Sequence, residues 1–218
     1  MTSFHLEHTI LGITWLPAGT LAFVILLVMS YIVYMYRLMS AKTEKDVLKE
    51  IAYRDSLTGI YNRAKSQRIF SSLNSTSADF AFVSIDMNGL KLINDRYGHN
   101  EGDRQLKAFA TAFHDAFAEV GTTIRLGGDE FLAIVRHEHI AEVDTALAKM
   151  AELQKELSAN LLTPLEAAYG VAYRHELSKD KNAHSKEMAQ VEPEKVYQLA
   201  DERMYAMKSV MKSTLVRL

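Results

Sequence analysis

The sequence of 218 residues contains no cysteine, little proline and no excess of charge of either sign. The lack of cysteine excludes disulfides, cysteine-ligated zinc and thiol nucleophiles. With 25 Lys and Arg against 27 Asp and Glu, the net charge of -2 argues against a nucleic-acid-binding protein. The balance of 48% hydrophobic and 24% charged residues is that of a folded chain, long enough for one domain and an appendage.

A long apolar run lies near the start of the chain, where no charged residue occurs from Thr9 to Tyr36. About 20 apolar residues cross a bilayer as a helix, so we expect one transmembrane helix over residues 13–37. A cleaved signal peptide normally has a basic start, and no Lys or Arg precedes this run. A membrane anchor is therefore the favoured interpretation.

Basic residues follow the apolar run and predict its orientation. Arg37, Lys42, Lys45 and Lys49 lie on its C-terminal side, which the positive-inside rule places in the cytoplasm. We expect residues 1–12 to form a short extracytoplasmic N-terminus of a single-pass inner-membrane protein. Residues 38–53 are expected to form a helical linker, which is either a short dimerising stalk or an ordinary solvated helix.

The remainder of the chain alternates between strand-like and helical patterns. Expected strands are Asp79–Asp86, a hairpin over Thr122–Val135, and Leu165–Tyr173; expected helices are Glu101–Glu119, Ala141–Leu157 and one that begins near Pro193. This order predicts the α+β class with a split βαβ plan (ferredoxin-like or palm-like), an antiparallel sheet and helices on one of its faces.

The hairpin carries two glycines followed by two acids. Gly127 and Gly128 suit a tight turn, and Asp129 and Glu130 follow them directly. In the split βαβ plan, the strand that ends at Asp86 lies beside this hairpin, so that Asp86 and Asp129 converge. Two converging carboxylates repel each other unless a cation lies between them, and magnesium shared with substrate phosphates suits such a place.

The segment after Asp86 offers groups for a nucleotide. Gly89 permits close backbone approach and Lys91 supplies positive charge, which together favour phosphate binding. Asn94 and Asp103 present an amide and a carboxylate that match the donors on the guanine edge. Helix capping is the more common use of either residue type.

Four motifs make the chain resemble the GGDEF-domain diguanylate cyclases, which join two GTP molecules into cyclic di-GMP. They are RDSLTGIYNR (54–63), SIDMNGLKLINDRYGHNEGD (84–103), RLGGDEF (125–131) and ADERMYAMK (200–208). The resemblance runs from about Tyr53 to Met211 and implies a catalytic domain over residues 54–218. It also implies that two domains face each other as a homodimer, because each holds one GTP.

The resemblance implies a role for each matching residue. Asp86 and Asp129 would hold Mg2+ (or Mn2+), assisted by the Met87 carbonyl. Gly127, Gly128 and Glu130 would complete the catalytic turn. Asn94 and Asp103 would read guanine, while Lys91, Lys208 and Lys212 would contact phosphates. Asp55 and Arg125 are hypothesised to form a structural pair that connects the end of the helical linker to the hairpin.

Two departures from the family pattern concern activity. Met211 and Lys212 stand where the family usually has Gly and Arg, and lysine lacks the bidentate fork of arginine. Ala118 and Gly121 replace the Arg and Asp of the family's product-binding inhibitory site. An active cyclase is the leading hypothesis, and a catalytically weak or silent GTP-binding GGDEF domain is the alternative.

Overall fold

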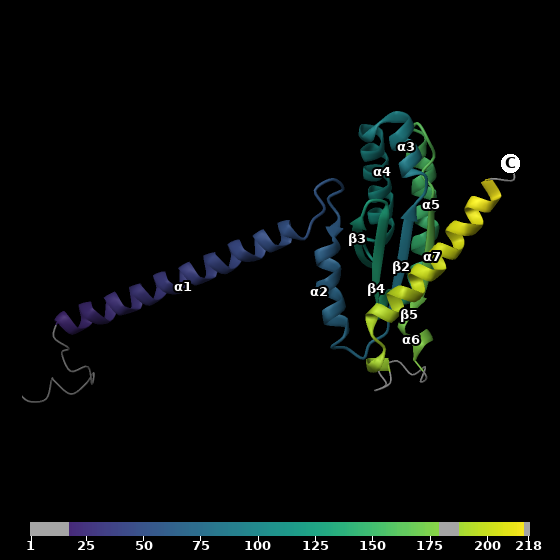
Figure 1. Ribbon diagram of the computed structural model, residues 1–218. Coiled ribbons are helices and arrows are strands. Elements are labelled where there is room, and N and C mark those ends of the chain that lie inside the picture. Colours follow the sequence, from purple (N-terminus) through teal and green to yellow (C-terminus); the bar gives the residue numbers. More distant parts are fainter. Residues whose placement is uncertain (1–17, 179–187, 216–218) are drawn as a thin grey trace, which may run out of the picture. The chain divides into compact units, whose positions relative to one another are not determined.

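The structure is a computed structural model that describes residues 18–178 and 188–215 (Figure 1). The chain divides into two compact units, residues 1–52 and residues 53–218. The expected N-terminal segment, the first five residues of the expected span and residues 179–187 lie outside the described residues.

The first unit contains one continuous helix, α1 (Ala18–Ala52), of 35 residues. It joins the expected span and the expected linker without a break, because the sequence between them has no proline or glycine. Its most apolar 18-residue window has a mean hydropathy of 2.0, and its large apolar side chains are exposed. By length and composition alone, α1 is long and apolar enough to cross a membrane.

The second unit is built on a sheet of five strands. They are β1 (Tyr61–Asn62), β2 (Phe80–Met87), β3 (Gly121–Gly127), β4 (Glu130–Arg136) and β5 (Ala167–Tyr173), in the order β1-β3-β4-β2-β5. The expected antiparallel pairing holds for β3–β4, β4–β2 and β2–β5, but β1 pairs parallel to β3. The sheet is therefore mixed. Strand β1 was not predicted from the sequence, because two residues are too few to produce an alternating pattern.

Helices surround the sheet. They are α2 (Arg63–Leu73), α3 (Leu90–Tyr97), α4 (His99–Phe117), α5 (Val143–Ser158), α6 (Arg174–Leu177) and α7 (Pro193–Leu215), with 3-10 turns η1 (His137–Glu142) and η2 (Met188–Gln190). Helices α2 and α6 were not predicted from the sequence. The Asn62 side chain caps α2 by accepting hydrogen bonds from the Ala64 and Lys65 amides. Gly98, with φ +85°, separates α3 from α4.

The expectation of helices on one face of the sheet is wrong, because both faces are covered (Figure 1). Val83 and Ile85 of β2 belong to a core that includes Phe109 of α4, whereas Phe82 belongs to a second core with Val196 of α7. Every residue of β2 is buried. A strand buried on both faces reads as a continuous apolar run, which predicts two covering layers.

Candidate active site

The hairpin between β3 and β4 places its acids against the end of β2. Asp86 lies opposite Glu130 in the antiparallel ladder, so both side chains are on the same face of the sheet. The Met87 amide donates to the Asp129 carbonyl at 2.9 Å, which ties the turn to β2. Asp86 is buried, Asp129 is half-buried and Glu130 is exposed. The expected convergence of Asp86 with the turn is therefore present.

The turn differs in detail from the expected Gly-Gly turn. Gly127 still pairs with Glu130, so Gly128 and Asp129 occupy the loop. A register shift lies between Arg125 and Gly127, and both glycines have positive φ, +149° and +53°. Larger residues rarely adopt this backbone, so the glycines set the shape of the turn.

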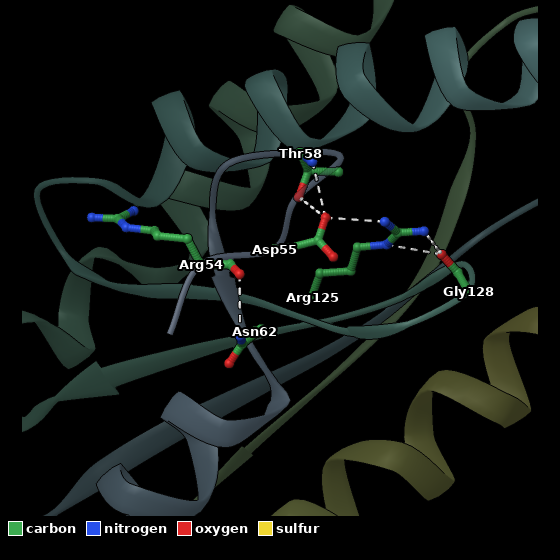
Figure 2. A network of polar contacts seen from close by, with 6 residues as sticks. All are labelled: Arg54, Asp55, Thr58, Asn62, Arg125 and Gly128. Atoms are coloured by element: carbon green, nitrogen blue, oxygen red, sulfur yellow. Dashed lines mark hydrogen bonds and ion pairs between the residues drawn. The ribbon is translucent and has the colours of Figure 1, made fainter. Parts of the chain in front are cut away.

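Arg125 connects this turn to the segment before β1 (Figure 2). Its Nη1 donates to Asp55 Oδ1 at 3.0 Å, while Nε and Nη2 donate to the Gly128 carbonyl at 3.1 and 2.8 Å. Asp55 Oδ1 also accepts from the Thr58 amide and hydroxyl at 2.9 and 2.7 Å. Asp55 and Arg125, which were hypothesised to pair, are thus hydrogen-bonded to each other. The hydrogen bonds from Arg125 to the Gly128 carbonyl were not predicted from the sequence.

Electrostatics at Asp55 favour its ionised form. Partial burial acts to raise the pKa of Asp55, but the hydrogen bonds from Thr58 and Arg125 outweigh it and hold the pKa below its usual value. The carboxylate is therefore charged and held in place next to Arg125.

Helix α7 brings lysines to the same corner of the sheet. Lys208 Nζ donates to Asp86 Oδ1 at 2.5 Å. Burial raises the pKa of Asp86 above its ordinary value against the hydrogen bond from Lys208, and repulsion from Asp129 acts in the same direction as burial. Helix α7 can approach because Gly170 of β5 has no side chain, and a Cβ there would lie 2.1 Å from the Ala200 carbonyl oxygen.

A cavity of about 600 Å³ opens at this corner between α3 and α7. Its polar and charged lining includes Asn88, Lys91, Arg96, Asp129, Glu166, Lys208 and Lys212. Gly89, with φ +77°, lies at its wall where α3 begins. Four cationic side chains around one opening favour a polyanionic ligand such as a triphosphate.

The expected guanine readers lie on neighbouring helices. Asn94 is on α3 and Asp103 is on α4, on either side of the Gly98 break. Among the described residues, neither belongs to the lining of this cavity. A Cβ on Gly102 would lie 1.9 Å from Asn94 Oδ1, so the Asn94 amide occupies the space above Gly102.

The donor set at the corner fits a divalent cation shared with phosphates. Asp86 and Asp129 offer carboxylates at the end of β2 and in the turn, and oxygen ligands suit Mg2+. Within residues 18–178 and 188–215, no group of three or more His, Cys, Asp or Glu side chains is placed to hold a metal. Magnesium is seldom enclosed by protein ligands alone, so two carboxylates completed by substrate oxygens match its chemistry.

Asn88 and Arg96 line the cavity and had no expected role. The Asn88 amide donates to the Met211 sulfur at 3.5 Å, and Arg96 lines the cavity one helical turn after Leu92. The i, i+4 spacing of Leu92 and Arg96 is a signal that the sequence analysis could have used. The contact of Asn88 with Met211 joins residues 123 positions apart and had no local signal.

Comparison with known proteins identifies the family. The family model described as "Diguanylate cyclase, GGDEF domain" matches residues 52–214. This chain belongs to the GGDEF family. The probable diguanylate cyclase DgcJ of Escherichia coli (strain K12) is 38% identical over 85 residues, which cover 37% of this chain and 17% of that protein. The probable diguanylate cyclase DgcT of the same organism is 26% identical over 211 residues, or 93% of this chain and 43% of that protein.

Solved structures agree on the fold of this GGDEF protein. The diguanylate cyclase SiaD of Pseudomonas aeruginosa, solved with its activator SiaC, superposes with a TM-score of 0.68 at 22% identity over 88% of this chain and 71% of that one. The chain spans less than half the length of each curated relative described above. The comparisons thus establish the family and the palm-like GGDEF fold.

Proposed function

We propose that this protein is a membrane-anchored diguanylate cyclase that condenses two GTP molecules into cyclic di-GMP and releases two pyrophosphates. The observation that carries the proposal is a cavity lined by Asp129, Lys208 and Lys212, in which Lys208 is paired with the neighbouring carboxylate of Asp86. This combination matches the needs of phosphoryl transfer, in which catalysis consists mostly of positioning and charge neutralisation.

Some residues of the chain would bind the metal, and others would bind the phosphates. Asp86 and Asp129, with the Met87 carbonyl, would hold Mg2+ or Mn2+, which supplies charge neutralisation at the reacting phosphate and lowers the pKa of the attacking 3′-hydroxyl. Lys91, Lys208 and Lys212 would bind the triphosphate as point charges.

The turn and the neighbouring helices would orient the substrate. Gly127 and Gly128 allow the backbone to approach the nucleotide, and Glu130 lies opposite Asp86 in the ladder at the edge of the site. Asn94 and Asp103 would hold the guanine edge by hydrogen bonds. Arg125 keeps the turn in one shape through the Gly128 carbonyl.

The reaction requires two such sites. One domain presents one cavity at this corner, and the product joins two nucleotides, so two copies of the chain would face each other. Helix α1 would anchor each copy in the inner membrane with the GGDEF domain in the cytoplasm, because basic residues follow its apolar part. The exposed residues of its last turns could pair the copies as a stalk.

The test is product formation by the full chain. We expect the protein, purified in detergent with Mg2+, to convert GTP into cyclic di-GMP and pyrophosphate, both detected by mass spectrometry. Asp129→Ala should be inactive, whereas Glu152→Ala, which removes an exposed acid from α5, should match the wild type. GTP binding without product in the wild type would support the alternative of a silent GGDEF domain.

A further inference from the structure

Lys208 and Asp86 form an ion pair inside the candidate site. The Nζ–Oδ1 distance is 2.5 Å, and the two side chains are 21% and 10% exposed. Asp129 and Lys212 also act electrostatically on Asp86, but the direct hydrogen bond comes from Lys208. The carboxylate proposed as a metal ligand is thus already neutralised by a cation of the chain itself.

The ammonium group and a divalent cation compete for this carboxylate. Mg2+ binds oxygen at about 2.0–2.1 Å in a nearly octahedral shell, and an ammonium hydrogen-bonded to the same carboxylate would lie close to it and be repelled. A metal that binds Asp86 through Oδ1 therefore competes with Lys208 for that oxygen. Exchange is possible because lysine carries its charge on a flexible four-carbon stem.

The rest of the α7 interface can stay in place during such an exchange. Ser84 of β2 donates to Asp201 at 3.1 Å, and Asn88, directly after β2, donates to Met211 at 3.5 Å, so the two contacts lie on either side of Asp86 in the chain. These contacts, together with the close approach at Gly170, hold the helix independently of Lys208. Only the side chain would move, and the cavity that it lines lies directly beside it.

We propose that Lys208 is an internal counter-cation that holds Asp86 in the empty site, yields it to the divalent metal, and then pairs with the nucleotide phosphates. The inference rests on the proposed nucleotide site and adds an order of events to it. Its consequence is weak metal binding until Lys208 has been displaced, so that metal and triphosphate bind cooperatively.

The first test measures Mn2+ binding to the nucleotide-free full chain in detergent, with free Mn2+ followed by electron paramagnetic resonance. We expect Lys208→Gln to bind Mn2+ about tenfold more tightly than the wild type, because a charge-assisted competitor is lost. Lys208→Arg keeps the competing charge and should stay within about twofold of the wild type.

Two controls separate this effect from a general change in charge. Lys155→Gln removes an exposed lysine on α5 and should leave the Mn2+ affinity unchanged. Lys212→Gln removes a charge that acts on Asp86 by Coulombic attraction, whereas Lys208 also donates a hydrogen bond, so Lys212→Gln should have a smaller effect than Lys208→Gln. Equal effects of Lys208→Gln and Lys155→Gln would overturn the proposal.

A second test uses the unaltered protein and therefore does not depend on the folding of a variant. Limited acetylation of lysines, quantified by mass spectrometry, should modify Lys208 slowly in the presence of a chelator, faster with Mg2+ alone, and slowly again with Mg2+ and a non-reactive GTP analogue. Lys155 serves as the internal reference.

The outcomes distinguish this inference from the proposed function. An active cyclase in which Mg2+ leaves the acetylation of Lys208 unchanged would overturn the exchange and keep the function. The three-step labelling pattern in a protein that makes no cyclic di-GMP would support the exchange and overturn the function.

Discussion

Arg125 donates to Asp55 with one end of its guanidinium and to the Gly128 carbonyl with the other, so one side chain links residues 55 and 128 (Figure 2). Only the planar fork of arginine supplies donors in both directions. Asp55 precedes the first strand by a few residues, whereas Gly128 lies in the proposed catalytic turn. A displacement of the segment around Asp55 would therefore be transmitted through Arg125 to the turn.

The first prediction concerns this link. Arg125→Ala should reduce the free energy of unfolding by about 2 kcal/mol and the rate of pyrophosphate release at least about tenfold, because the Gly128 carbonyl loses its donors. Asp55→Ala should cost less when Arg125 is already absent than in the wild type. Exchanging the two residues should not restore activity, since an aspartate at position 125 has no donor for Gly128. If the losses in stability caused by Arg125→Ala and Asp55→Ala are strictly additive in the double variant, the link is contradicted.

The second prediction concerns pH. The pKa of Asp55 is lower in the folded protein than its ordinary value of 3.8, so the unfolded chain binds the proton more tightly. The ionised group therefore stabilises the fold above about pH 4, and this contribution is lost as pH falls through the folded pKa. Urea denaturation should show a stability gap between wild type and Asp55→Asn at pH 6 to 7, which narrows below about pH 4. If the difference in stability between wild type and Asp55→Asn does not change with pH, the charge of Asp55 makes no contribution to it.

The third prediction concerns Gly102. An added Cβ would meet the flexible end of Asn94, which can rotate away, while alanine suits a helix interior better than glycine by about 1 kcal/mol. Gly102→Ala should thus fold at least as stably as the wild type, yet its KM for GTP should rise about tenfold, because the Asn94 amide is displaced. Adding Gly102→Ala to Asn94→Ala should change KM little further. A large extra loss in the double variant would show that Gly102 acts in another way.

The fourth prediction concerns the end of α7. Lys212→Arg should increase kcat/KM by up to about tenfold, since a bidentate fork binds phosphate better than an ammonium group. Met211→Ala should free the Asn88 amide from its contact with sulfur and enlarge the cavity, without the cost of a helical glycine. Steady-state kinetics of pyrophosphate release measure kcat/KM for both variants. An unchanged kcat/KM in Lys212→Arg would indicate that position 212 does not reach the phosphates.

The fifth prediction concerns product inhibition. Ala118 is exposed after the last turn of α4 and Gly121 begins β3, so neither offers the charged side chain that the family pattern implies for product binding. Added cyclic di-GMP should not slow pyrophosphate release through this site. A Cβ at Gly121 would lie 2.8 Å from the Ile134 carbonyl oxygen, so Ala118→Arg with Gly121→Asp should lower stability by about 1–3 kcal/mol. Inhibition that maps to residues near Ala118 would contradict this expectation.

Much of the fold could be predicted because it rests on local patterns. The apolar run 80–87, the glycine turn and the proline at the start of α7 each show periodicity or turn chemistry within a few residues. The meeting of Asp86 with the Asp129 turn followed from strand pairing in the split βαβ plan. The short strand β1 and helix α2 were missed, because Tyr61–Asn62 has no period and α2 has only one narrow buried stripe.

The sequence alone determined the family motifs, the order of most elements and which acids would converge, because turn geometry and side-chain period are local properties of the chain. Only the tertiary structure decided that Lys208 holds Asp86, that Arg125 also donates to the Gly128 carbonyl, and that Asn94 fills the space above Gly102. These contacts depend on how the helices pack against the sheet and on the space that remains between packed side chains. No local pattern in the sequence encodes this packing.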